Sequence, residues 1–135
     1  MNIELTDKEF RRLLDLVYIG NWILNSTREK DRFEDYDILQ EKLFALCAKN
    51  GMNALISRWQ GHIFPSSAYE NGGIHEAIAD YEDAVFFDIL AEELARRDMS
   101  AEQISQDDAE ELNARMEEYF AEFEKHGIEN VKVEA

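Results

Sequence analysis

The sequence predicts an all-α fold with four main helices in an antiparallel, partly irregular bundle. Apolar residues recur with the 3.6-residue helical period over four long stretches. Residues typical of helix starts precede several of these stretches, and the chain has a single proline, Pro65. Hydrophobic residues make up 45% of the chain, which suffices for a core. We therefore expect one helical domain spanning residues 1–135.

The first expected helix begins near Asp7. Thr6 and Glu9 have the spacing of a capping box, in which the threonine oxygen accepts the Glu9 amide and the glutamate returns to the Thr6 amide. The apolar stripe that follows, widened by two flanking residues, predicts the core-facing side of a helix that ends near residues 25–27. The stripe and its flanking residues are Phe10, Leu13, Leu14, Val17 and Leu24, with Leu16 and Ile23.

A second helix is expected from Phe33 to Lys49, antiparallel to the first because the charged connector 28–31 is short. The following segment is less regular. A short helix over Asn53 to Trp59 and a loop of about fourteen residues over 60–73 are predicted there. Loops of this length in compact domains often carry function.

A third helix over 74–98 is apolar on two faces, which is typical of a central helix covered on both sides. Ser100 and Ser105 are candidate caps for a fourth helix that ends at Gly127. The alternating residues 2–5 and 128–134 allow a short strand pair between the two ends of the chain. Frayed termini are the alternative.

The charge of the chain limits its partners. Thirty acidic and fourteen basic residues give a formal charge of −16, which repels nucleic-acid phosphates and anionic lipid. No apolar run approaches the length of a membrane span, and the N-terminus lacks the features of a signal peptide. The lone Cys47 indicates a buried thiol in a reducing compartment. We expect a cytoplasmic protein that contacts neither nucleic acid nor membrane directly, and whose partner is a protein or a second copy of itself.

The first candidate site is an aromatic surface. Tyr18 and Trp22 lie one helical turn apart on the arc opposite the expected stripe, among charged residues. Aromatic side chains in such surroundings are typical interface anchors. Alternatively, the segment 52–73 folds over them and they belong to the core. The residues that decide between the two interpretations are Trp59, Ile63, Phe64 and Tyr69.

The alternative site is a metal site on the third helix. Glu76, Asp80 and Asp83 follow i, i+4, i+7 spacing, so their carboxylates share one face and could hold Mg²⁺ or Mn²⁺ in a hydrolase of phosphorylated small molecules. Acidic residues early in a helix also complement the helix dipole without any metal. The second helix lacks the Glu-x-x-Glu pair that helical pyrophosphohydrolases use.

The last helix has an acidic outer face. Such a face could meet a basic protein or mimic nucleic-acid charge, and a solubilising surface is the simpler interpretation. Its residues are Glu110, Glu111, Glu117, Glu118, Glu122 and Glu124.

No nucleophile motif, glycine-rich phosphate loop or thiolate metal site occurs in the sequence. We therefore predict a protein-interaction or regulatory domain that self-associates as a homodimer and requires no cofactor, in preference to an enzyme.

Overall fold

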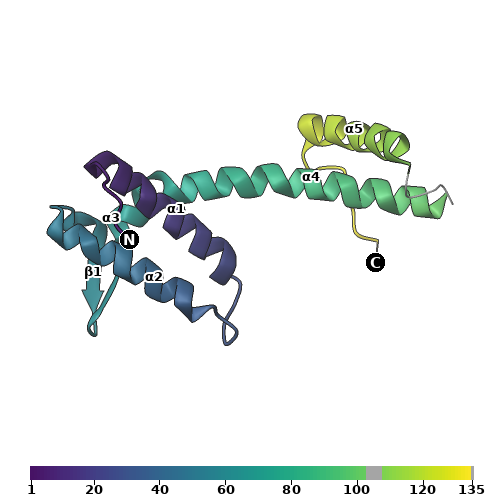
Figure 1. Cartoon of the computed structure of the whole chain (residues 1–135). Coiled ribbons are helices and arrows are strands. Elements are labelled where there is room, and N and C mark those ends of the chain that lie inside the picture. Colours follow the sequence, from purple (N-terminus) through teal and green to yellow (C-terminus); the bar gives the residue numbers. More distant parts are fainter. Residues whose placement is uncertain (103–107, 135) are drawn as a thin grey trace. The chain divides into compact units, whose positions relative to one another are not determined.

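The computed structural model describes residues 1–102 and 108–134 (Figure 1). Its main helices are α1 (Asp7–Asn25), α2 (Glu34–Ala45), α4 (His75–Ala101) and α5 (Ala109–His126). These helices and one short strand pair confirm the expected all-α class. The chain divides into two compact units, Met1–Ile78 and Ala79–Ala135, and α4 passes from the first into the second. The single domain expected from the sequence stays a prediction.

Helix α1 begins as predicted. The Glu9 amide donates to Thr6 Oγ1 at 3.1 Å, and the Thr6 amide donates to Glu9 Oε1 at 3.0 Å. The two bonds satisfy amides that have no partner inside the helix. The start of α1 is therefore specified within four residues of sequence.

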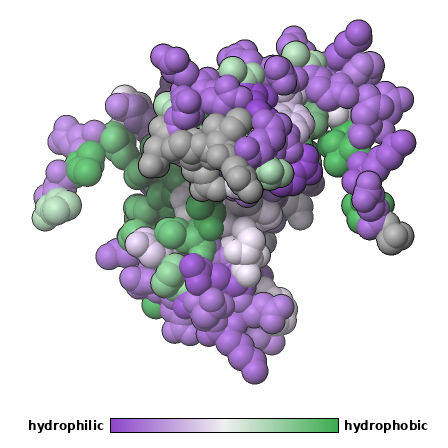
Figure 2. Space-filling model, turned by 90° about the vertical axis from the view of Figure 1, so that its right-hand side faces the viewer, coloured by the Kyte–Doolittle hydropathy of each residue, from purple (hydrophilic) through white to green (hydrophobic). Residues whose placement is uncertain are grey.

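The buried face of α1 differs from the expected one. Leu16 and Ile23, placed beside the core-facing stripe by the sequence, are 71% and 61% exposed. Figure 2 shows that hydrophobic residues, in green, reach parts of a surface that is otherwise mostly hydrophilic. The expectation was wrong because it counted only apolar residues, whereas two buried positions are asparagines whose amides are hydrogen-bonded. The buried residues are Phe10, Leu14, Tyr18, Asn21 and Asn25.

Helix α2 and the 3-10 turn η1 (Leu46–Lys49) together cover the expected second helix. The short helix predicted over Asn53 to Trp59 is wrong. Its first part is the 3-10 turn η2 (Asn53–Leu55), and the remainder is the strand β1 (Ile56–Trp59).

The single loop predicted over 60–73 is also wrong, because most of this segment has regular structure. The elements that it contributes to are the strand β2 (His62–Pro65), the short helix α3 (Ser67–Tyr69) and the kinked turn η3 (Glu70–Ile74).

The strand pair lies in this central segment, and residues 1–6 and 128–134 are not in strands. β1 and β2 are antiparallel, with Trp59 opposite His62 and Ile56 opposite Pro65. Gln60 and Gly61 connect them with φ of 50° and 79°. Two central residues with positive φ match a type I′ turn, whose twist suits a two-residue hairpin.

The core of the first unit forms where the central segment packs against α1 and α2. The Tyr69 ring lies 5.1 Å from that of Phe44 and 5.3 Å from that of Tyr18, measured between centroids. Cys47 is fully buried, as predicted, and burial raises the pKa of its thiol. Residues 52–78 therefore complete a core that two helices alone would leave open.

The second unit contains the remainder of α4 and helix α5. Ala91, Ala95 and Met99 line the buried face of α4. From α5, the Phe123 ring lies 5.4 Å from that of Phe87. Asp108 caps α5 by accepting the Glu111 amide at 3.1 Å. Of the caps expected from the sequence, Ser100 lies within α4 and Ser105 lies outside the described residues.

The outer side of α4 does not match the prediction of a helix covered on both faces. Tyr81, Phe86 and Ile89 are all exposed in the described structure. Apolar residues on two faces of a helix indicate burial only when the unit has enough elements to cover both.

Candidate binding groove

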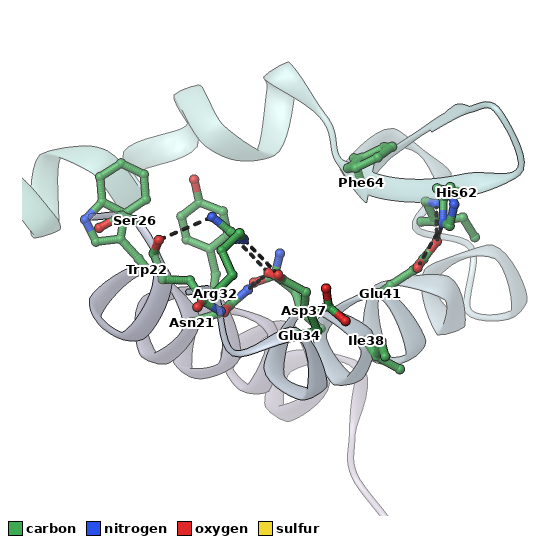
Figure 3. A pocket seen from close by; sticks show the side chains of 14 residues that line it. Asn21, Trp22, Ser26, Arg32, Glu34, Asp37, Ile38, Glu41, His62 and Phe64 are labelled. Carbon is green, nitrogen blue, oxygen red and sulfur yellow. Dashed lines mark hydrogen bonds and ion pairs between the residues drawn. The ribbon is translucent and has the colours of Figure 1, made fainter. Parts of the chain in front are cut away.

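A pocket of about 720 Å³ lies on the first unit between α1, α2 and strand β2 (Figure 3). We call it the groove. Most of its surface comes from apolar atoms, and polar side chains form the remainder. The residues that line it are Tyr18, Asn21, Trp22, Asn25, Ser26, Arg32, Glu34, Asp37, Ile38, Gln40, Glu41, His62, Ile63 and Phe64.

Two buried asparagines form the base of its polar part. Asn25 Nδ2 donates to Asn21 Oδ1 at 2.6 Å and to the Phe33 carbonyl at 3.1 Å, and Asn25 Oδ1 accepts the Phe33 amide at 2.8 Å. Asn21 Nδ2 in turn donates to Asp37 and Gln40 of α2, at 3.0 and 3.1 Å. This network fixes α2 against α1, and its members are held before any ligand arrives.

Arg32 and Asp37 form a bidentate ion pair beside the asparagines. Arg32 Nε and Nη2 donate to the two carboxylate oxygens at 3.0 and 2.8 Å, and Arg32 Nη1 donates to the Asn25 carbonyl at 3.2 Å. The hydrogen bonds from Arg32 hold the pKa of the Asp37 carboxyl below its usual value, and the bond from Asn21 adds to this effect. Asp37 is thus kept ionised within the groove.

Glu41 joins α2 to strand β2. Its carboxylate accepts the Ile63 amide at 2.8 Å and lies 3.1 Å from His62 Nδ1. The Ile63 bond lowers the pKa of Glu41, and His62 contributes further. The Ile63 amide faces away from β1 and donates to Glu41. The amide is therefore not free to pair with a further strand added at this edge.

Apolar side chains lie on either side of this polar network. Figure 3 shows Trp22 toward one end of the groove and Phe64 toward the other, with Arg32 and Asp37 between them. Trp22 is partly buried, whereas Ile38 and Phe64 are exposed. The Glu34 side chain has no hydrogen bond or ion pair with any residue that the structure describes. The groove therefore offers apolar contact area together with one unpaired carboxylate.

A buried tyrosine supports the Trp22 end. Tyr18 Oη donates to Glu70 Oε2 at 2.7 Å and lies 2.7 Å from His75 Nε2. Burial raises the pKa of Tyr18, and the Glu70 carboxylate raises it further. The His75 ring lies 4.9 Å from that of Trp22. These contacts place the indole against a hydrogen-bonded cluster that links α1 to the start of α4.

The six residues predicted as interface anchors lie in three different environments. Tyr18 and Tyr69 are buried inside the first unit, which favours the core interpretation for both. Trp22, Ile63 and Phe64 line the groove. Trp59 lies beside the hairpin turn and is largely exposed. Whether these residues form an interface stays a prediction.

The sequence did not indicate the polar residues of the groove. Asn21 and Asn25, four residues apart on the buried face of α1, were the available signal, because buried amides require partners. Their partners Arg32 and Asp37 come from the connector and the next helix, with no spacing motif to reveal them.

The metal alternative gains no geometric support. Glu76, Asp80 and Asp83 lie on α4 and are exposed. Across residues 1–102 and 108–134, no three acidic, histidine or cysteine side chains come close enough together to hold a metal ion.

The acidic face of α5 is only partly free. Arg115 donates to Glu111 at 2.7 Å, and Asn130 donates to Glu122 at 2.7 Å. The other four of its glutamates are exposed.

Among the helices in the described parts of the chain, none is both long and apolar enough to cross a membrane. Comparisons with protein-family models, with curated proteins and with solved structures find no match to this chain.

Proposed function

We propose that this chain is a protein-interaction domain whose groove binds a segment of a partner protein that carries both basic and apolar side chains. The observation that carries this proposal is the composition of the groove. Apolar area from Trp22, Ile38 and Phe64 lies beside three carboxylates in one concave surface. Concave, mostly apolar sites with a few fixed polar groups are typical of binding sites.

The charges of the groove favour a basic segment. Its ionised lining groups are Glu34, Asp37 and Glu41 against Arg32, which leaves an excess of acidic charge. The whole chain carries −16, which attracts a cationic partner and increases its rate of encounter. A lysine or arginine near Glu34 would pair with the one carboxylate of the groove that has no partner among the described residues.

The fixed geometry of the groove favours binding over chemistry. Asp37 and Glu41 already accept hydrogen bonds, and their pKa values are lowered. Lowered pKa values suit electrostatic attraction, whereas a carboxyl acting as a general acid near neutral pH requires a raised one. Because the network is in place before binding, less ordering opposes the association.

The test is a fluorescence titration that uses Trp22 as the reporter. Both tryptophans of the chain lie in the first unit, so Trp59→Phe leaves the groove indole as the only one. A synthetic peptide of alternating lysine and leucine is titrated, and a glutamate–leucine peptide of equal length serves as the comparison. We expect saturable binding of the lysine peptide alone, weakened by salt because the pairing is partly electrostatic.

Two variants with the same charge change locate the site. Glu34→Gln removes the unpaired carboxylate of the groove, whereas Glu29→Gln removes an exposed carboxylate of the connector that does not line it. We expect weaker binding only for Glu34→Gln. Equal weakening by both variants would mean that the peptide responds to total charge, and the proposal would then fail.

A further inference from the structure

The edge of strand β2 that does not pair with β1 borders the groove. On this side the strand meets α2 through the bond between Glu41 and the Ile63 amide. In a two-residue hairpin the residues that flank the turn, here Trp59 and His62, exchange hydrogen bonds, and every second residue directs its backbone groups away from the partner strand. The β2 residues that point away from β1 are therefore Ile63 and Pro65.

Neither of these two residues can donate a hydrogen bond to an incoming strand. The Ile63 amide donates to Glu41 at 2.8 Å, and Pro65 has no amide hydrogen. Binding by strand addition depends on main-chain hydrogen bonds along an exposed sheet edge. An added strand would find only acceptors at this edge, so its own carbonyl groups would lack donors there. The groove is thus closed to a segment that binds as a third strand beside β2.

The polar groups at the base of the groove already have partners inside the protein. The Asn21 and Asn25 amides bond to each other, to α2 and to the Phe33 backbone. Both carboxylate oxygens of Asp37 accept from Arg32. An extended segment lying over these groups would bury backbone amides and carbonyls that require partners of their own. A helix pairs its backbone groups within the segment and therefore requires none from the groove.

We propose that the partner segment of the proposed function, on which this inference rests, binds the groove as an amphipathic α-helix. Its apolar stripe lies against the groove, and basic residues flank the stripe. Trp22 and Phe64 lie toward opposite ends of the groove (Figure 3), so a stripe that runs along a helix contacts both. A lysine or arginine beside the stripe then reaches Glu34, which is exposed and carries the charge that such a residue complements.

The size of the groove sets the length of this helix. An α-helix with its side chains is about 11 Å across and rises about 5.4 Å per turn, so each turn occupies roughly 500 Å³. The groove has a volume of about 720 Å³. If one half of the helix enters the groove, this volume corresponds to about three turns, or roughly eleven residues. Apolar anchors at three- and four-residue spacing fall on one side of a helix of that length.

The test compares two peptides of equal length and equal lysine and leucine content, titrated into the Trp59→Phe protein. In one peptide the leucines recur at three- and four-residue spacing, and in the other they alternate with lysine. We expect the helix-patterned peptide to bind at least about tenfold more tightly, because alternation leaves fewer leucines on the contact side of a helix. Equal or tighter binding of the alternating peptide would overturn the helical mode and leave the proposed function standing. Binding of neither peptide would remove both.

The conformation of the bound peptide is measured directly with a copy labelled with ¹³C and ¹⁵N. In the complex with the unlabelled full chain, we expect helical carbon shifts over about three turns of the helix-patterned peptide. Extended shifts in the bound peptide would contradict the proposal, whichever of the two peptides binds more tightly.

A matched pair of peptide variants separates helix formation from charge and apolar contact. One central lysine on the side away from the leucine stripe is replaced by proline in one variant and by alanine in the other, so both lose the same charge and keep the stripe. Proline in the interior of a helix removes a backbone hydrogen bond and clashes with the preceding turn. We expect the proline variant to bind at least about tenfold more weakly than the alanine variant. Equal affinity of the two variants would show that the bound segment is not helical and would overturn the proposal.

Discussion

Replacing Asn25 by alanine should destabilise the first unit more than any surface substitution. Asn25 is 1% exposed, and its amide makes three hydrogen bonds, two with the Phe33 backbone and one with Asn21. Phe33 is the N-cap of α2 and its side chain makes no cap hydrogen bond, but Asn25 of the preceding helix holds the backbone amide and carbonyl of Phe33 in place. Its loss leaves buried donors and acceptors unpaired and opens a small cavity.

The expected cost follows from these bonds. At about 1 kcal/mol of net stabilisation for each hydrogen bond, the substitution removes about 3 kcal/mol. A unit the size of residues 1–78 has a stability of roughly 4 to 12 kcal/mol. The loss is therefore a large fraction of the total, and with a urea dependence of about 1 kcal/mol per molar the midpoint should fall by about 3 M.

Urea unfolding followed by tryptophan fluorescence measures this change in the first unit alone, because residues 79–135 contain no tryptophan. Asn71→Ala is the matched control. Asn71 is exposed and its side chain makes no hydrogen bond with the residues that the structure describes, so its replacement should change the unfolding free energy by no more than about 0.5 kcal/mol.

Asn25→Leu separates hydrogen bonding from packing. Leucine fills similar space but cannot pair with the Phe33 backbone. If Asn25→Leu unfolds within about 0.5 kcal/mol of the wild type, the hydrogen bonds contribute little and the reasoning is refuted.

Three further changes test other parts of the first unit. Glu41→Ala should cost about 1 to 2 kcal/mol in the same urea assay, because the Ile63 amide loses its acceptor; an unchanged midpoint would show that water replaces the carboxylate. Asp37 has a lowered pKa through Arg32, so its stabilisation is present above the unfolded value of about 3.9 and is lost as the pH falls through the folded value. The stability difference between wild type and Asp37→Asn should thus be full at neutral pH and shrink in acid, and a difference that grows in acid would contradict this. Gly61→Ala should cost about 1 kcal/mol because φ is 79° there, and a cost near zero would argue against the positive-φ turn.

The sequence predicted the features of the fold that depend on neighbouring residues. The Thr6 and Glu9 capping box lies within four residues, and the start of α1 was correct. The fold class was predicted from the helical period of the apolar residues, which can be read from residues three and four positions apart.

Features that depend on distant residues were missed. The sequence suggested that Leu16 and Ile23 flank the core, but Asn21 and Asn25 take the inner side because residues 33, 37 and 40 supply their hydrogen bonds. No sequence pattern within α1 indicates that residues 33, 37 and 40 are the partners. Leu16 and Ile23, the two residues that the error concerns, are exposed in the described structure.

The hairpin was missed for a different reason. The two-residue turn Gln60–Gly61 was a readable signal, because a short polar loop that ends in glycine is typical of hairpins. It was outweighed by the expectation that a mostly helical chain continues as helix. Of the groove, the sequence named only Trp22, Ile63 and Phe64 as candidate contact residues; the polar lining was missed, since it comes from α1, the connector and α2, and only folding brings these together.

The most direct test of the proposed function is the map of amide chemical-shift changes in ¹⁵N-labelled protein on addition of the lysine–leucine peptide. The account predicts that the largest changes occur at residues lining the groove, including Trp22, Gln40 and Ile63. Changes centred on the exposed glutamates of α5 would show that the peptide binds acidic surface without using the groove, and would contradict the account.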